Sequence, residues 1–339
     1  MKLLLHIGPH KTGSSSIQGS LAAAAKDLLS KGVLYYAPSK NPAFSIAANY
    51  LSPAQRAQPE LLRVFRTDDA VMEWSRDNLA ELKTTVKESD ARICVISSEH
   101  FSIIPKEHVF QFTRDMNEIF DEIQVLGYAR DPVTLYPSEV QQNIQGGRRL
   151  ADTRTPYSFR YTFRRQISKY VEFLGRKSIV VRNFDRANLE RGDVVHDFAA
   201  QIGRYGVNVD IPSITVNESL PGAVIAWLLG VNETWDRSVL GNERHRVLKL
   251  LKKSETLARL PKLRLEDSGM QSLIRTRARA DLNWLNDFHL KGQLPLDTTA
   301  GPVSLDDDDA VMMKWMRDWI MSYLTTDSLK LIYDEILTA

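Results

Sequence analysis

The stretch Leu3–Ser16, with the sequence LLLHIGPHKTGSSS, decides how this chain begins to fold. A short apolar run leads into a loop of Gly, Pro, Lys and hydroxyl residues, and apolar residues then recur at helical spacing from Ile17 to Leu28. This pattern predicts a strand over 2–7, a loop, and a helix over 15–30. Such a turn directs backbone N–H groups and the positive end of a helix dipole at one place, so we expect it to bind a phosphate group.

The spacing within this loop indicates which phosphate chemistry to expect. Gly8 and Gly13 keep the glycine spacing of nucleoside-triphosphatase loops, in which a lysine follows the second glycine. In this chain Ser14 occupies that position, and the lysine of the loop, Lys11, lies between the two glycines. A triphosphate also needs Mg²⁺ and usually an aspartate to hold it, and we find no apolar strand ending in an Asp that would clearly serve. The loop therefore favours a ligand with fewer charges and no metal.

Two stretches of the sequence resemble one known family. Gly8–Ser16 resembles the 5′-phosphosulfate-binding loop of sulfotransferases that use 3′-phosphoadenosine 5′-phosphosulfate (PAPS). Val125–Pro132, with Ser138 further on, resembles the 3′-phosphate motif of the same family, with Arg130 at a strand end and the serine eight residues later. Weaker similarities follow at Ile179–Phe184 and Val216–Leu220. The two main motifs stand in the order that the family requires.

The resemblance implies a sulfotransferase of bacterial type. Such an enzyme moves a sulfuryl group in line from PAPS to a hydroxyl or amine, without a metal, and releases adenosine 3′,5′-bisphosphate. Lys11 would stabilise the bridging oxygen as its bond to sulfur breaks, and Arg130 with Ser138 would hold the 3′-phosphate. The loop residues assigned to the cofactor are His10, Lys11, Thr12, Gly13, Ser14, Ser15 and Ser16. The structural alternatives are that the serines cap the helix and that Arg130 forms an ion pair with Asp131 or a neighbouring acid.

A general base must remove the proton of the acceptor. The apolar run Ile93–Ser97 is followed by Ser98, Glu99 and His100, which places two proton acceptors at the end of an expected strand. Members of the family use either Glu or His in this role, and we favour Glu99 slightly over His100. The alternative is that Glu99 caps a helix or pairs with an arginine. His10, within the loop, is a third candidate, better suited to a structural or substrate-side role.

Composition limits the function classes. The 339 residues carry 44 Lys and Arg against 42 Asp and Glu, a net charge of +2, so bulk charge indicates no nucleic-acid partner. The single cysteine, Cys94, is typical of a reducing compartment. No apolar run approaches the length of a membrane span, and the N-terminal apolar run is too short for a secretory signal. We therefore expect a cytoplasmic protein without a membrane span.

Short apolar strands that alternate with helices predict an α/β fold, in which helices flank a parallel sheet on both faces. The expected strands are 2–7, 33–36, 92–97, 122–129 and 178–182, and expected helices include 106–120, 133–145 and 159–174. Residues 38–90 are predicted to be a helical insertion, and residues from about 185 to 339 a helical half, within a single domain spanning 1–339. Ligands of parallel sheets bind at the carboxyl ends of strands. We therefore expect Lys11, Glu99, His100 and Arg130 to converge there.

Three further patterns allow both a structural and a functional interpretation. Residues 144–186 hold eleven Arg or Lys against three acids, which indicates a solvated face or a basic rim for an anionic acceptor such as an acidic glycan. The stripe from Met312 to Tyr323, which includes Trp315 and Trp319, is expected to be core. Late arginines, at 275, 277 and 279, match the family's late 3′-phosphate segment only poorly. The acidic run Asp306–Asp309 is expected to cap a helix.

Two rival functions remain at this point. One is an atypical P-loop kinase that uses ATP and Mg²⁺, and the other is a catalytically inactive nucleotide-binding module. The acceptor of a sulfotransferase would be a carbohydrate, a lipid-linked sugar or a small alcohol, and the sequence contains no pattern that selects among them.

Overall fold

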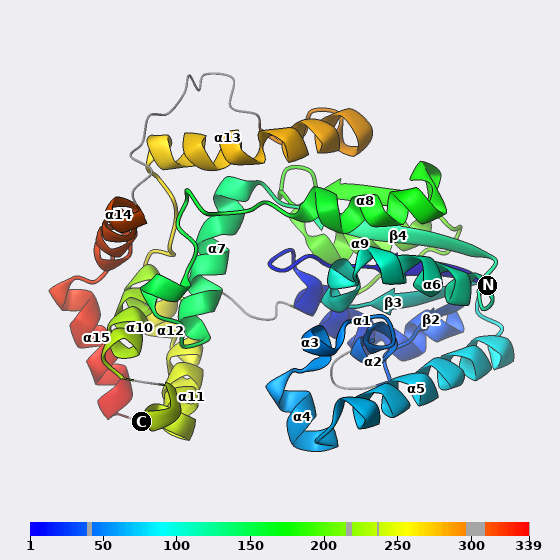
Figure 1. Cartoon of the computed structure of the whole chain (residues 1–339), viewed down its shortest axis with the longest axis horizontal. Helices are drawn as coiled ribbons and strands as arrows, with labels where there is room; N and C mark the ends of the chain where they lie inside the picture. Colours follow the sequence, from blue (N-terminus) through cyan, green and yellow to red (C-terminus); the bar gives the residue numbers. More distant parts are fainter. Residues whose placement is uncertain (39–42, 215–218, 236, 296–308, 339) are drawn as a thin grey trace. The chain divides into compact units, whose positions relative to one another are not determined.

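The fold is described from a computed structural model of the chain (Figure 1). It describes residues 1–38, 43–214, 219–235, 237–295 and 309–338. These group into two compact units. The first, termed the sheet unit, comprises Met1–Arg130, Thr162–Val216 and Trp284–Leu294, and the second, termed the helical unit, comprises Asp131–Tyr161, Asn217–Asn283 and Pro295–Ala339.

The sheet unit is built on a five-stranded parallel sheet with the order β2-β3-β1-β4-β5. The strands are β1 (Lys2–His6), β2 (Val33–Tyr35), β3 (Ile93–Ser97), β4 (Glu122–Ala129) and β5 (Ile179–Asn183). The last residue of β1, His6, pairs with Ser97 at the end of β3 and with Leu126 in β4. The predicted α/β fold with a parallel sheet flanked by helices is thereby confirmed.

Alternation along the strands assigns residues to the two faces of this sheet. On one face, Leu4 and Tyr128 belong to a buried cluster that includes Ile17 and Leu21 of α1 (Ser14–Ser30) and Phe198 of α9 (Val194–Gly203). On the other face, Gly127 lies against Phe163 and Ile167 of α8 (Phe163–Leu174). The sheet is therefore covered by helices on both faces, as Figure 1 shows.

Four of the described helices lie between β2 and β3. The helices are α2 (Phe44–Ala48), α3 (Pro53–Arg56), α4 (Pro59–Phe65) and α5 (Asp68–Glu88). A 3-10 helix, η1 (Glu99–Ile103), follows β3, and α6 (Lys106–Asn117) follows η1. Helix α6 ends and α8 begins a few residues inside the predicted ranges, which is the usual uncertainty of helix ends.

The helical unit consists of helices packed around α10, which contacts α7, α14 and α15. Its helices are α7 (Pro132–Gln145), α10 (Gly222–Thr234), α11 (Arg237–Lys253), α12 (Glu255–Ala258), α14 (Asp309–Met321) and α15 (Thr326–Leu337). Helix α13 (Ser268–Leu285) belongs to it up to Asn283. Of the acidic run Asp306–Asp309, the first three residues lie outside the described residues, and Asp309 begins α14.

The expected core stripe of α14 is correct for only half of its residues. Met312, Met316 and Ile320 are buried. Trp319 and Tyr323 remain partly exposed, because their polar atoms bond to the backbone of Arg264: Trp319 Nε1 donates to its carbonyl oxygen at 2.8 Å, and the Tyr323 hydroxyl donates to the same atom at 3.2 Å. Trp315 is likewise partly exposed. Amphipathic aromatic side chains often take such positions, with one end buried and the other at the surface.

Candidate functional site

The loop between β1 and α1 is shaped by two residues in the left-handed region, Lys11 (φ 64°) and Gly13 (φ 79°). A Cβ atom on Gly13 would lie 2.7 Å from Val194 Cγ1, so any other residue would strain both the backbone and the packing against Val194. A Cβ atom on Gly8 would lie 2.3 Å from the hydroxyl oxygen of Ser14, so Gly8 leaves the space that Ser14 occupies. The spacing of the two glycines is thus a requirement of how the loop packs.

The loop delivers the first turn of α1 to the carboxyl edge of the sheet. The N-cap residue Gly13 provides no side-chain hydrogen bond to that turn, and the buried hydroxyl of Ser14 has no hydrogen-bond partner among the described residues. The Thr12 hydroxyl instead donates to the carbonyl of Pro9 at 2.6 Å and braces the loop from within. Ser15 is exposed and Ser16 partly exposed. The backbone donors of a helix start, together with the Ser14 hydroxyl, are suited to an anion.

Arg130, which follows the last residue of β4, contacts this loop. Its Nη1 donates to the backbone carbonyl of Lys11 at 2.9 Å, although the two residues are 119 positions apart in the chain. The guanidinium also lies 5.7 Å from the centre of the Phe184 ring, just beyond β5. The fold therefore brings the second sequence motif to the first through Arg130.

Ser138 has a different environment. It lies in the second turn of α7, in the helical unit, where its hydroxyl donates to the carbonyl of Thr134 at 3.3 Å. Arg130 belongs to the sheet unit, so the joint role of Arg130 and Ser138 remains a prediction.

Asp131, considered above as a partner of Arg130, forms an ion pair with a residue of α13. Asp131 contacts Arg275, with 3.4 Å between Oδ2 and Nη2, and both residues belong to the helical unit. Arg277 lies 4.5 Å from the centre of the Tyr157 ring in the same unit. Arg279 is exposed. Two of the three late arginines thus have contacts that serve the packing of the helical unit.

Glu99 begins η1 and forms an ion pair with a residue of the loop after β1. Its Oε2 atom lies 3.0 Å from Nδ1 of His10, and both side chains are partly exposed. Burial raises the pKa of the Glu99 carboxyl. However, the hydrogen bond with His10 and the positive charges of His10, His100 and Lys11 outweigh burial, and the pKa is lowered overall. Glu99 is therefore a carboxylate that contacts the loop after β1 through His10.

His100, the other candidate base, is a buried packing group. Its Nδ1 lies 3.2 Å from the Ser98 hydroxyl, and its Nε2 lies 3.0 Å from Nε2 of Gln58. Its ring stands edge-to-face on Phe44 at 4.4 Å. Burial lowers the pKa of His100, and the charge of Glu99 only partly offsets this. Both ring nitrogens of His100 thus make contacts within the protein.

The segment that carries Glu99 is held from two sides. From α8, the Lys169 ammonium donates to the carbonyls of Ser102 (2.8 Å) and Ile104. The neighbouring Tyr170 hydroxyl donates to the carbonyl of Phe101 at 2.7 Å. Burial lowers the pKa of Lys169 to about 7. In the sequence, Lys169 is one of several basic residues of a charged segment, and nothing in the pattern distinguishes it.

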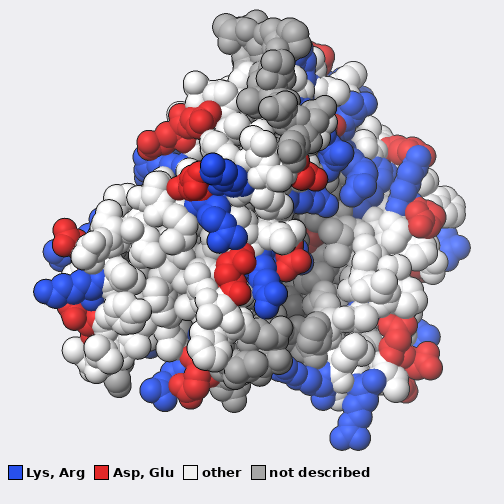
Figure 2. All heavy atoms as spheres, turned by 60° about the vertical axis from the view of Figure 1, so that its left-hand side comes forward, with Lys and Arg blue, Asp and Glu red and all other residues white. Residues whose placement is uncertain are grey.

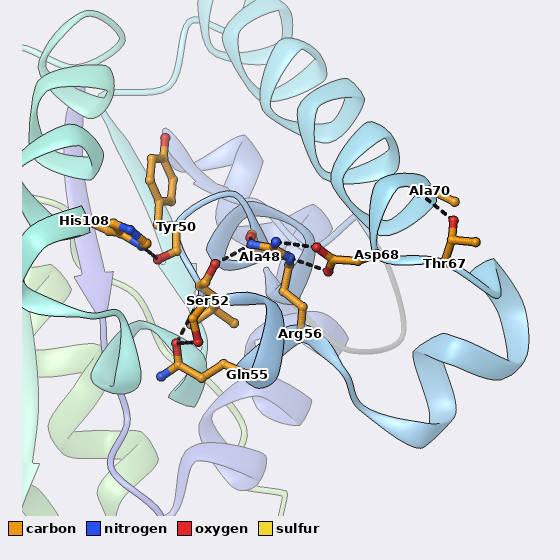
Figure 3. A network of polar contacts seen from close by, with 10 residues as sticks. Ala48, Tyr50, Ser52, Gln55, Arg56, Thr67, Asp68, Ala70 and His108 are labelled. Atoms are coloured by element: carbon orange, nitrogen blue, oxygen red, sulfur yellow. Dashed lines mark hydrogen bonds and ion pairs between the residues drawn. The ribbon is translucent and has the colours of Figure 1, made fainter.

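The second support comes from the residues between β2 and β3. Gln55 donates to the carbonyl of Ile103 at 2.6 Å. As Figure 3 shows, Gln55 also accepts a bond from the backbone of Ser52, and the adjacent Arg56 makes a bidentate pair with Asp68 at 2.7 and 2.6 Å. Arg56 is buried, so this pair fixes the short helix α3 that presents Gln55. The bond of Gln55 to Ile103 and the pair of Arg56 with Asp68 could not be predicted from the sequence, because each joins residues of separate elements.

The segment of weaker similarity at Ile179–Phe184 contains an arginine with a structural role. The Arg182 guanidinium donates two hydrogen bonds to the buried carboxylate of Asp197, one from Nε to Oδ2 at 3.0 Å and one from Nη2 to Oδ1. The same carboxylate accepts bonds from the Tyr128 hydroxyl at 3.0 Å and from the backbone N–H of Glu190 at 3.2 Å. Residues 215–218, which include most of the other weak similarity, lie outside the described residues.

Several residues of the basic segment 144–186 are engaged within the protein rather than forming a continuous rim. Lys169 and Arg182 are the two described above, and Arg149 donates to the carbonyl of Asn232 at 3.3 Å. Arg164 and Arg176 lie over the rings of Trp284 and Phe288. On the face of the molecule shown in Figure 2, basic and acidic side chains are intermingled. These contacts weaken the interpretation as a basic rim.

Comparison of the chain with protein-family models, curated proteins and solved structures gave no match. None of the helices within the described ranges is long and apolar enough to span a membrane. Within the same ranges, no group of three or more His, Cys, Asp or Glu side chains is arranged to hold a metal ion. The functional argument therefore depends on the geometry of the loop, η1 and Arg130.

Proposed function

We propose that this protein is a PAPS-dependent sulfotransferase that acts on a hydroxyl or amine of its acceptor. The observation that carries the proposal is the hydrogen bond from Arg130 to the carbonyl of Lys11. It joins the segment that resembles a 3′-phosphate motif to the loop that resembles a 5′-phosphosulfate site. A ligand with anionic groups at both ends of one nucleotide matches two such sites in contact.

The loop supports a small anion more than a triphosphate. Its lysine lies within the turn, and Ser14 stands at the position where a triphosphatase has its lysine. In the proposed reaction, the backbone N–H groups at the start of α1 and the Ser14 hydroxyl would bind the 5′-phosphate. The Lys11 ammonium would stabilise the charge that develops on the bridging oxygen as its bond to sulfur breaks.

The environment of η1 supports Glu99 rather than His100 as the residue that faces the reaction. His100 is buried, and both of its ring nitrogens have partners. Glu99 is partly exposed and lies beside the loop. The acceptor itself is proposed only as a class, a carbohydrate or a small alcohol.

Calorimetry tests this proposal without knowledge of the acceptor. The protein is titrated with adenosine 3′,5′-bisphosphate, ADP and ATP, each with and without Mg²⁺. We expect a metal-independent preference for the bisphosphate, weakened by Arg130→Ala by about tenfold or more, since charge-assisted bonds contribute about 1.5–3 kcal/mol. Mg²⁺-dependent binding of ATP with no such preference would contradict the proposal and favour a kinase. Tight binding of the bisphosphate with no sulfuryl transfer to any acceptor would favour an inactive module.

A further inference from the structure

His10 and Glu99 form a pair that the sequence alone does not connect. His10 lies in the loop after β1 and Glu99 lies at the start of η1, 89 positions later in the chain. The two side chains meet at 3.0 Å between Nδ1 of His10 and Oε2 of Glu99. Residue 11, the next in the loop, is the lysine assigned to the leaving group. The pair therefore lies beside the position where the sulfuryl group would react.

We infer that His10 is the catalytic base and that Glu99 is the positioning residue that orients it, an inference that rests on the proposed function. Glu99 accepts a hydrogen bond from Nδ1–H of His10, which fixes the tautomer in which Nε2 carries the lone pair. This is the arrangement by which a carboxylate prepares a histidine to accept a proton in other enzymes. The inference gives His10 a different role from the structural or substrate-side one considered from the sequence.

The electrostatics favour the imidazole over the carboxylate as the base. A base works best when its pKa lies near the working pH. Burial raises the pKa of Glu99, but its hydrogen bond with His10 and nearby charges lower the pKa overall and away from that range. Its carboxylate is therefore a poor acceptor for the proton of an alcohol. The His10 imidazole is the other proton acceptor of this pair. His100 is already bonded through both nitrogens and serves the packing of η1.

In the proposed step, one proton and one sulfuryl group are transferred. The proton of the acceptor O–H passes to Nε2 of His10 while the acceptor oxygen forms a bond to sulfur. The bond between sulfur and the bridging oxygen breaks, and its electron pair stays on the 5′-phosphate, beside the Lys11 ammonium. His10 leaves the step as an imidazolium that the Glu99 carboxylate stabilises.

The first test measures the tautomer of His10 by ¹⁵N NMR of the ring nitrogens in the full-length protein, with the signal assigned from the His10→Gln variant. At a pH where the ring is neutral, we expect the Nδ1–H tautomer in the wild type. Glu99→Ala should shift the population toward Nε2–H. An Nε2–H tautomer in the wild type, or a population that Glu99→Ala leaves unchanged, would overturn the inference. The readout needs neither PAPS nor an acceptor.

The second test uses reverse transfer from an aryl sulfate to adenosine 3′,5′-bisphosphate. By microscopic reversibility, the base of the forward reaction protonates the departing oxygen in reverse, and this help matters least when the leaving group is already stable as an anion. We expect His10→Gln to lose about 10²-fold or more with phenyl sulfate but much less with 4-nitrophenyl sulfate. His245→Gln, at an exposed position of α11, is the matched control.

Equal losses with both aryl sulfates would show that His10 acts only through structure and would overturn its role as base. A wild type that neither binds the bisphosphate nor transfers sulfate would instead contradict the proposed function. In that case the tautomer measurement still decides whether Glu99 orients His10.

Discussion

Replacing Lys169 with methionine removes the cation that anchors η1 and preserves most of the side-chain volume. In the wild type, the Lys169 side chain is 7% exposed and donates to the carbonyls of Ser102 and Ile104. Burial lowers its pKa to about 7, against about 10.4 for a lysine in an unfolded chain. Folding therefore disfavours the protonated form of this side chain.

The sign of the pH effect follows from this difference. Between the two pKa values the unfolded chain binds more protons at Lys169 than the folded chain, so the free energy of unfolding rises with pH. The cost of keeping the buried ammonium is fully present below about pH 7 and disappears above the unfolded pKa. One pKa unit corresponds to about 1.4 kcal/mol. Between about pH 6 and pH 9, the free energy of unfolding of the wild type should therefore rise by about 2–3 kcal/mol relative to that of Lys169→Met.

Urea unfolding followed by circular dichroism at several pH values measures this gain. The difference in the free energy of unfolding between wild type and variant removes the contributions of groups that titrate in both proteins. Lys177→Met, at an exposed lysine of the same segment, should run parallel to the wild type at every pH. If the Lys169→Met curve also runs parallel to the wild type, the pKa of Lys169 is not depressed and the argument from burial is wrong.

Three further predictions concern single substitutions. Lys11→Ala should reduce reverse transfer from 4-nitrophenyl sulfate by about 10²-fold or more, the cost of one preorganised donor, and near-normal turnover would refute the role assigned to this lysine. Asp197→Asn should lower the free energy of unfolding by about 3–5 kcal/mol. We expect the lower figure, because the partner Arg182 is 31% exposed. A loss under about 1 kcal/mol in a urea titration would contradict the structural role of the bonds around Asp197. Gly13→Ala should lower the free energy of unfolding by about 1–3 kcal/mol, because Gly13 has a positive φ, and the melting temperature should fall. The control Gly203→Ala in α9, where no atom lies within 4 Å of the Cβ position, should leave the melting temperature unchanged.

Much of the sheet unit could be predicted because its signals are local. The apolar runs that become β1, β3 and β4 are short, bounded by polar residues and separated by helical patterns, and these features alone imply a parallel sheet. The loop could be located for the same reason, since Gly8 and Gly13 stand where the backbone needs them.

Contacts between distant segments could not be predicted, and they decide the candidate site. Glu99 and His100 are adjacent in the sequence, and only the packing of Phe44 and Gln58 around His100 separates their roles. Lys169 looks like any basic residue of a solvated helix face until its carbonyl partners are known. The aromatic residues of α14 show the same limit, because periodicity identifies the inward face but not how completely a large ring is covered.

The hydrogen bond from Arg130 to Lys11 links the affinity for a ligand to the rigidity of the loop after β1. The guanidinium holds the turn beside which the 5′-phosphate would bind. Under the proposed function, the sites for the 5′-phosphate and the 3′-phosphate are therefore coupled through the Arg130 side chain. Occupancy of either site should then stiffen the other, and a nucleotide lacking its 3′-phosphate should bind less tightly and also leave the turn more open to amide exchange. Arg130→Lys would not be conservative, because a single ammonium lacks the planar set of N–H donors that could bond to the Lys11 carbonyl and to a 3′-phosphate together.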